Sequence, residues 1–120
     1  MSTRLECRYL VTAPDLNAHG TLHGGILLKW ADESAGMHAR KLSRRTCVTR
    51  CMDRVDFTST ARLGDIIKVI TTVEQVGTSS LTFRVVIKED ITDRAIASIS
   101  RVVFVAIDDK SQPVPHYIKI

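Results

Sequence analysis

The sequence has no long apolar run, few aromatic residues and few cysteines. No apolar stretch reaches the roughly 18 residues of a transmembrane helix, and the first residues, M-S-T-R-L-E-C, lack the apolar core of a secretory signal. Aromatic residues make up only 5% of the 120 residues, and neither an aromatic-interleaved basic strand nor a helix-turn-helix pattern is present. We therefore expect a cytoplasmic protein that binds neither membranes nor nucleic acid.

The three cysteines, Cys7, Cys47 and Cys51, are odd in number and form no C-x-x-C pair. We expect them to be buried free thiols in a reducing compartment, with no disulfide framework and no metal site. The net charge of +4 comes mainly from the basic stretch Arg40–Arg45. Cations there would complement the dipole at the end of a helix, and they would also suit a ligand that carries phosphate.

Length and composition indicate a single globular domain over residues 1–120. An apolar fraction of 44% and a charged fraction of 25% are ordinary for such a domain, and the chain is long enough for one core but not for two. From about Gly24 to Leu42, apolar residues cover most of a helix circumference. This pattern predicts a helix that is buried on nearly all sides.

β-branched residues and recurring turn signals predict strands before and after this helix. They lie at about Leu5–Val11, Cys47–Phe57, Ile66–Val76, Ser80–Glu89 and Ala95–Ile107. Short connections, such as the turn at Gly64-Asp65, favour an antiparallel meander, and the tail from Asp108 to Ile120 is expected to form an extended edge segment. The prediction is an α+β fold in which a curved antiparallel sheet of about five strands wraps around one long central helix.

One segment, N-A-H-G-T-L-H-G-G-I-L-L-K-W-A-D from Asn17 to Asp32, carries the chemistry. Gly24 and Gly25 open the helix and let a ligand approach the backbone closely, because they have no Cβ. The first N–H groups of a helix have no intrahelical acceptor and lie at the positive end of its dipole, so they can bind an oxygen that becomes negative. This favours an oxyanion hole, although the glycines would also allow tight packing of the helix on the sheet.

Asp32 places a carboxylate on this otherwise apolar helix, where an unpartnered charge is costly. It could be a structural group paired with Lys29, Arg40 or a backbone group, or a catalytic group acting as a general base or a nucleophile. It follows Gly24 by eight residues, about 12 Å along the helix axis, so the two cannot serve one carbonyl within one subunit. We therefore predict a homodimer in which Asp32 of one subunit approaches Gly24 of the other across antiparallel helices.

Four ordered blocks of the sequence resemble the hotdog-fold acyl-CoA thioesterases. The motif N-x-x-G-x-x-H-G-G, with an aspartate nine residues after the histidine, resembles both phenylacetyl-CoA-type thioesterases and YciA-like acyl-CoA hydrolases. The blocks V-D-F-T-S-T-A-R-L-G-D, V-G-T-S-S-L-T-F and F-V-A-I-D-D-K-S-Q-P-V-P resemble the YciA-like group more closely. The resemblance implies the hotdog fold and a hydrolase of fatty acid metabolism that converts acyl-CoA to a free acid and coenzyme A, without any other cofactor. It also implies a dimer that assembles further into a tetramer or hexamer.

The resemblance also implies roles for single residues. Asn17 would position the attacking water or the thioester, although it could instead form an Asx turn. His23 could hydrogen-bond or polarise the thioester carbonyl, or only cap the helix, and Gly25 belongs to the substrate-binding set as the second residue of the glycine pair. The candidates for holding the pantetheine and phosphates of coenzyme A are Arg62, Gly77, Thr78, Ser79, Ser80 and Arg84. A simple hairpin turn would explain Gly77 and Thr78 equally well.

Two other classes of function remain open from the sequence. A non-catalytic acyl-CoA-binding regulatory module would keep the pocket without turnover, and a hotdog dehydratase would use a histidine and an acidic residue in a different layout. Asn17 and Asp32 together favour the hydrolase. The large side chain of Trp30 is expected to affect the size of the acyl pocket, and His19 and His38 are expected to be surface or packing residues.

Overall fold

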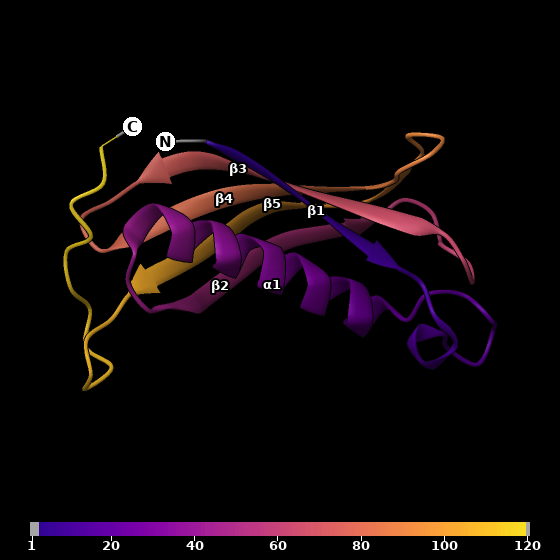
Figure 1. Cartoon of the computed structure of the whole chain (residues 1–120), viewed down its shortest axis with the longest axis horizontal. Coiled ribbons are helices and arrows are strands. Elements are labelled where there is room, and N and C mark those ends of the chain that lie inside the picture. Colours follow the sequence, from indigo (N-terminus) through magenta and orange to yellow (C-terminus); the bar gives the residue numbers. More distant parts are fainter. Residues whose placement is uncertain (1–2, 120) are drawn as a thin grey trace.

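The computed structural model describes residues 3–119, in which one antiparallel sheet curves around one long helix (Figure 1). The strands are β1 (Arg4–Leu10), β2 (Cys47–Phe57), β3 (Ile66–Val76), β4 (Ser80–Glu89) and β5 (Ala95–Ala106). The helix α1 spans Gly24–Ser43, and a short 3-10 helix, η1, spans Ala13–Asp15. The sequence predicts all five strands and the helix to within one or two residues at each end.

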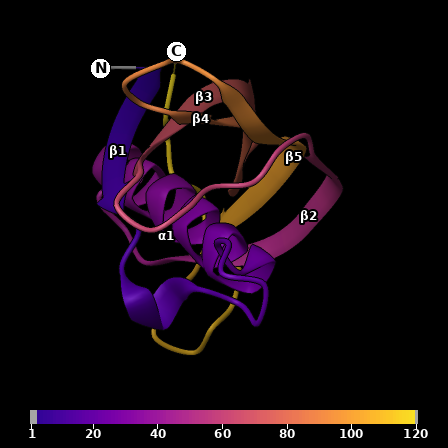
Figure 2. The same ribbon diagram turned by 90° about the vertical axis from the view of Figure 1, so that its right-hand side faces the viewer.

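The strands lie in the order β1-β3-β4-β5-β2, and every neighbouring pair is antiparallel. The predicted meander is correct for β3, β4 and β5, but it is wrong for β2, which pairs with β5 instead of β3. The physical reason is the connection through residues 58–65, which passes the start of α1 and carries the chain across the end of the sheet (Figure 2). As a result β2 is an edge strand, with no strand on its outer side among the residues described.

The core lies between the helix and the concave face of the sheet. Along β4, side chains alternate between the two faces: Leu81, Phe83 and Val85 are fully buried toward α1, whereas Arg84 is exposed on the outer face. The ring of Phe83 packs against His38, with 5.0 Å between the ring centroids. His38 is also buried and hydrogen-bonds Thr71, so the prediction that it is a packing residue is confirmed.

The expected burial of α1 on nearly all sides is wrong for a single chain. One face packs on the sheet, and its buried residues are Leu27, Trp30, Ala31, Ser34, Ala35, His38, Ala39, Leu42 and Ser43. On the other face Lys29 and Met37 are exposed, and Leu28 and Asp32 are half-buried. Five strands cover only part of a helix circumference, so this second face stays open.

The segment after β5 does not form the expected extended edge segment; it crosses the end of the sheet (Figure 1). The Val114 N–H donates to Ala106 O at 2.9 Å, and the His116 N–H donates to Thr78 O at 3.1 Å. Pro113 and Pro115 have no N–H to donate, which prevents a regular ladder here. The last predicted residue, Ile120, lies outside the described residues.

Cys7, Cys47 and Cys51 are all free, as predicted, but they are half-buried instead of buried. Within residues 3–119, no cluster of three or more histidine, cysteine or carboxylate side chains is arranged to hold a metal ion. No helix in this part of the chain has the length and apolar character needed to span a membrane.

Candidate active site

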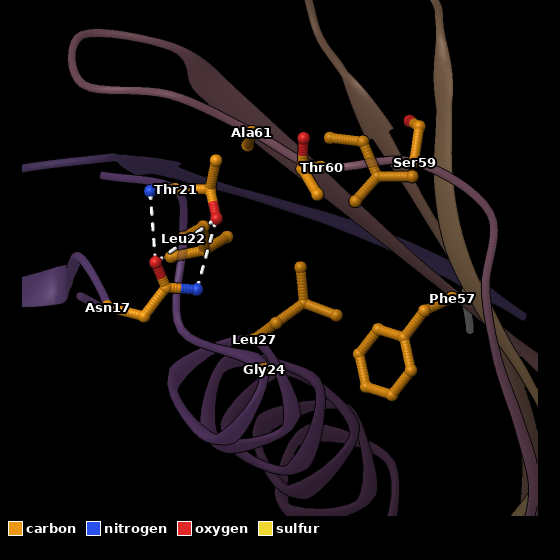
Figure 3. A pocket seen from close by; sticks show the side chains of 10 residues that line it. Asn17, Thr21, Leu22, Gly24, Leu27, Phe57, Ser59, Thr60 and Ala61 are labelled. Carbon is orange, nitrogen blue, oxygen red and sulfur yellow. Dashed lines mark hydrogen bonds between the residues drawn. The ribbon is translucent and has the colours of Figure 1, made fainter. Parts of the chain in front are cut away.

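A pocket of about 220 Å³ opens beside the first turn of α1 (Figure 3). It is lined by Asn17, Thr21, Leu22, Gly24, Leu27, Phe57, Ser59, Thr60, Ala61 and Ile96. These residues come from the loop before α1, the helix start, the end of β2, the connection to β3 and the start of β5. The lining is mostly apolar, with a few polar groups on one side, which is the usual composition of a small-molecule site.

Phe57, and not Trp30, is the large aromatic side chain that lines this pocket. Trp30 is buried in the core, where its ring stacks on Tyr9 with 4.8 Å between centroids. The expectation that Trp30 affects the pocket is therefore wrong, because its position on the helix directs it toward β1. The Phe57 ring lies at the pocket instead, 3.6 Å from the place that a Cβ on Gly24 would occupy.

The first turn of α1 leaves one backbone donor available. His23 is the N-cap residue: its Nδ1 accepts from the Gly25 N–H at 2.8 Å, and its carbonyl accepts from the N–H groups of Ile26 and Leu27. The Gly24 N–H has no acceptor anywhere in residues 3–119, and Gly24 lines the pocket. Of the roles considered for His23, the structure shows the helix cap.

The second glycine of the pair is required by the cap. A Cβ on Gly25 would lie 2.9 Å from the His23 ring, which is closer than a side chain tolerates. Since the Gly25 N–H already binds His23, it is not available to a ligand in this arrangement. The two glycines therefore differ: Gly24 leaves a donor at the pocket, and Gly25 makes room for the cap.

Asn17 lies in a tightly bonded loop at the edge of the pocket. Its Oδ1 accepts from the His19 N–H at 2.9 Å and from the Thr21 N–H at 3.2 Å. The loop is further fixed because Asp15 O accepts from the His23 N–H at 2.9 Å. Asn17 thus forms the Asx turn that the sequence allowed, and it lines the pocket as well. His19 is exposed, as predicted.

Asp32 is half-buried on the open face of α1, outside this pocket. Its Oδ1 accepts from the Thr49 hydroxyl at 2.5 Å. Neither Lys29 nor Arg40 forms an ion pair with it among the residues described, so the pairing considered from the sequence is absent. The Asp32 carboxylate is therefore held by a hydroxyl group of β2, and not by a cation.

Sequence reasoning missed Thr49. Its position depends on a β-bulge in β2, where one extra residue, Arg50, interrupts the pairing with β5 between Thr49 and Cys51. Bulges change the direction in which a strand presents its side chains, and they are frequent beside active sites. A hydroxyl on the strand that follows the helix was the only available signal, and the bulge itself cannot be seen without the strand pairing.

The remaining predicted residues lie at different places. Arg62 borders the pocket through its bridge to Thr21, and its N–H donates to the Asp65 carboxylate at 2.9 Å. The hairpin from Gly77 to Ser80 lies at the opposite end of the sheet from Gly24 (Figure 1). Arg84 is on the outer face of the sheet. Within one chain, the fold brings together five of the predicted residues: Asn17, His23, Gly24, Gly25 and Arg62. Contact of the hairpin and Arg84 with coenzyme A stays a prediction.

A model of the thioesterase superfamily matches residues 19–96. The chain is 40% identical over 104 residues to the uncharacterized acyl-CoA thioester hydrolase YkhA of Bacillus subtilis, which is 84% of this chain and 60% of that protein. It is 27% identical over 117 residues to the human cytosolic acyl coenzyme A thioester hydrolase, covering 92% of this chain and 31% of the relative. The chain thus spans less than two thirds of the length of these curated relatives.

Solved structures give a closer spatial comparison. An acyl-CoA hydrolase from Staphylococcus aureus, solved with butyryl coenzyme A, coenzyme A and coenzyme A disulfide, has a TM-score of 0.81 and 34% identity, covering 94% of this chain and 68% of that chain. The hexameric thioesterase from Yersinia pestis has a TM-score of 0.84 and 25% identity, covering 91% of each chain.

The S. aureus enzyme has also been solved as three alanine variants, of an asparagine, an aspartate and a threonine. In its sequence the aspartate follows the asparagine by 15 residues, and the threonine follows the aspartate by 17 residues. Asn17, Asp32 and Thr49 have the same two separations.

Proposed function

The chain belongs to the thioesterase superfamily, and from that membership we propose that it hydrolyses acyl-CoA thioesters to a free carboxylic acid and coenzyme A. The observation that carries the proposal is the pocket at the start of α1, where the Asn17 amide and the Gly24 N–H border an apolar cavity. The relatives named as acyl-CoA hydrolases, and the S. aureus enzyme solved with butyryl coenzyme A, support acyl-CoA as the substrate class.

In this proposal the thioester carbonyl oxygen accepts a hydrogen bond from the Gly24 N–H. Attack on the carbonyl carbon makes that oxygen negative, and the N–H at the positive end of the α1 dipole stabilises the charge. One such donor is typically worth about 3 kcal/mol in the transition state. When the tetrahedral intermediate collapses, the C–S bond breaks and coenzyme A leaves as the thiol after gaining a proton.

Asp32 of the partner subunit would either activate the attacking water or attack the carbonyl carbon itself. As a general base it would take a proton from water, and the resulting hydroxide would add to the carbonyl carbon. As a nucleophile it would form a mixed anhydride, which water then hydrolyses. The Thr49 hydroxyl bonds Oδ1, so Oδ2 would be the oxygen that acts. Both routes need Asp32 to reach a carbonyl that its own helix start cannot offer, about 12 Å away.

A twofold axis beside Leu28 would meet this requirement. Leu28 lies midway between Gly24 and Asp32 along α1, so antiparallel packing about it would bring each Asp32 to the Gly24 of the other subunit. The open face of α1 leaves this axis accessible, because Leu28 and Asp32 are only half-buried in one chain. The two residues lie about 40° apart around the helix, so they face the same side.

The edge strand β2 leads to the same axis independently. Phe57 lies against Gly24, and Thr49 binds Asp32. For Thr49 of one subunit to lie beside Phe57 of the other, the twofold axis must pass the residue midway between them in β2. That residue is Asp53. Two β2 strands pairing antiparallel about Asp53 would cover an 11-residue free edge, which is otherwise an aggregation hazard. We propose this dimer as the minimal unit, and assembly to a hexamer by analogy with the Y. pestis enzyme.

The activity is tested by measuring thiol release from short, long and aromatic acyl-CoAs, with wild type and Asp32→Asn side by side. We expect turnover by wild type and a loss of at least a hundredfold in kcat for the variant. Tight binding of acyl-CoA by wild type without any turnover would refute the hydrolase and favour a binding module.

The shared site has a separate test. Asn17→Ala and Asp32→Asn are each expected to lose at least about a hundredfold in kcat, but mixing them should restore activity, because half of the sites in a heterodimer combine two intact halves. Subunit exchange must be verified by mass spectrometry of differently labelled chains. Exchange without recovery would contradict a site shared between subunits.

A further inference from the structure

The Asn17 carboxamide oxygen is saturated by the loop that carries it. Oδ1 accepts from the backbone N–H of His19 at 2.9 Å, from the backbone N–H of Thr21 at 3.2 Å, and from the Thr21 hydroxyl at 3.2 Å. An amide oxygen has two lone pairs, and these three donors already share them. This oxygen cannot also accept a hydrogen bond from an attacking water.

The amide nitrogen keeps one free donor. Nδ2 carries two N–H groups, and one of them donates to Thr21 Oγ1 at 3.0 Å. The other has no acceptor within the described part of the chain. In Figure 3 the nitrogen lies on the pocket side of the oxygen, and Asn17 is one of the lining residues.

The loop also prevents the amide from rotating by 180°. A rotated amide would place its NH₂ group against the backbone N–H groups of His19 and Thr21, which would lose their acceptor at a considerable cost. Thr21 adds a further restraint, because its hydroxyl accepts from Nδ2 and donates to Oδ1. Thr21 is itself fixed: its carbonyl accepts from the Asn17 N–H at 2.8 Å, and it forms a bridge with Arg62.

We propose that Asn17 acts in the reaction only as a hydrogen-bond donor, through Nδ2, and that Thr21 is the positioning residue that keeps the amide in this orientation. The inference rests on the proposed hydrolysis of acyl-CoA. The free Nδ2–H would donate to the acyl oxygen as it becomes negative, as a second donor beside the Gly24 N–H. Accepting the proton of the water is then left to a carboxylate, and Asn17 takes no part in it.

Asn17→Asp separates the two possible roles, because an aspartate has nearly the same shape but only accepts hydrogen bonds when ionised. We expect kcat to fall about a hundredfold or more, at least as far as in Asn17→Ala, because losing one oxyanion donor costs about 10²–10³. An Asn17→Asp variant that keeps more than about a tenth of the wild-type kcat would overturn the donor role.

Thr21→Val and its matched control Thr21→Ser test the positioning role. We expect Thr21→Val to lower kcat about tenfold with little change in KM, since it removes one hydrogen bond to the amide, and Thr21→Ser to stay near wild type. In the Asn17→Ala background, Thr21→Val should have no further effect. A tenfold loss in that background too would show a merely structural role and overturn the proposal.

A readout that needs no turnover separates this inference from the proposed function. The side-chain NH₂ signals of Asn17 can be assigned in a ¹⁵N-labelled protein by their disappearance in Asn17→Ala. We expect Thr21→Val to shift these signals and to speed their exchange with water, whereas Thr21→Ser leaves them in place. Unchanged signals in Thr21→Val would overturn the role of Thr21 even if the enzyme is active. If wild type has no activity, the proposed function fails while this test still decides the orientation.

Discussion

Replacing Gly24 with proline removes one N–H group from the pocket and puts the ring Cδ in its place. Gly24 is the first residue of α1 after the N-cap His23, and proline is favoured at this position because its missing N–H has no partner inside the helix. The residue before a proline must be extended, and His23 already has φ −65° and ψ 129°. The added Cβ would meet the Phe57 ring at 3.6 Å, an ordinary van der Waals contact.

The expected effect of Gly24→Pro is a large loss of activity in a folded protein. The Gly24 N–H has no acceptor in residues 3–119, so the substitution breaks no hydrogen bond of the fold, and we expect the free energy of unfolding to change by less than about 1 kcal/mol. If this N–H is the oxyanion donor, kcat should fall by about 10²–10³, or roughly 3 kcal/mol in the transition state. Gly24→Ala is the matched control, since it adds the same Cβ and keeps the N–H.

The assay is thiol release under saturating acyl-CoA for wild type, Gly24→Ala and Gly24→Pro, with urea unfolding of all three. Equal activities of the alanine and proline variants would refute the oxyanion role, because they differ at the N–H. A similar large loss in both variants would point to a steric effect of Cβ and would refute it as well. Only a loss that is specific to proline supports the reasoning.

Three further predictions concern the supporting structure. Thr49→Val removes the 2.5 Å hydrogen bond to Asp32 and should lower kcat about ten- to a hundredfold with an unchanged circular dichroism spectrum; wild-type kcat would contradict the role of Thr49. Phe83→Ala empties a fully buried site and should reduce the urea-derived free energy of unfolding by about 3–5 kcal/mol; a loss under 1 kcal/mol would contradict the packing described. Hydrogen bonds from the hydroxyl and the N–H of Thr92 hold the pKa of Glu89 below its usual value. The ionised Glu89 therefore stabilises the fold above the unfolded pKa of about 4.3, and this stabilisation is lost as the pH falls through the lower folded pKa. The urea midpoint of wild type should therefore fall more between about pH 5 and pH 3 than that of Glu89→Gln, and parallel pH profiles would contradict this assignment.

Elements whose signals are local are predicted well from the sequence. The alternation of Leu81, Phe83 and Val85 with exposed residues is a property of consecutive positions, and it fixes both the existence of β4 and the face that meets the helix. The start of α1 is equally local, because the N-cap His23 and the glycine pair are adjacent in the chain. The burial of α1 on all sides was not predictable for one chain, since apolar periodicity does not say which molecule covers a face.

The strand order could not be predicted because it depends on contacts between distant residues. After the turn at Gly64, β3 could pair with β2 directly. Alternatively, the connection could pass the helix start, so that β3 lies on the far side of the sheet from β2. Local propensity does not distinguish these two paths. The pairing of β2 with β5 creates the bulge beside Thr49, and the bulge turns that hydroxyl to Asp32. A hydrogen-bond partner that arises in this way has no sequence motif of its own.

The sequence by itself determined the residues of the candidate site: Asn17 in the loop, the glycine pair that begins the helix, and Asp32 too far along the helix to meet its own Gly24. That separation follows from the fixed rise of an α-helix, so the prediction of a shared site between two subunits needs no coordinates. Only the tertiary structure decided which groups are available for chemistry. The Gly25 N–H donates to His23 Nδ1, and backbone N–H groups of the loop donate to Asn17 Oδ1. The Gly24 N–H remains unpaired among the described residues. Each of these outcomes depends on where a hydrogen-bond partner lies in space, and that is decided by the folded chain.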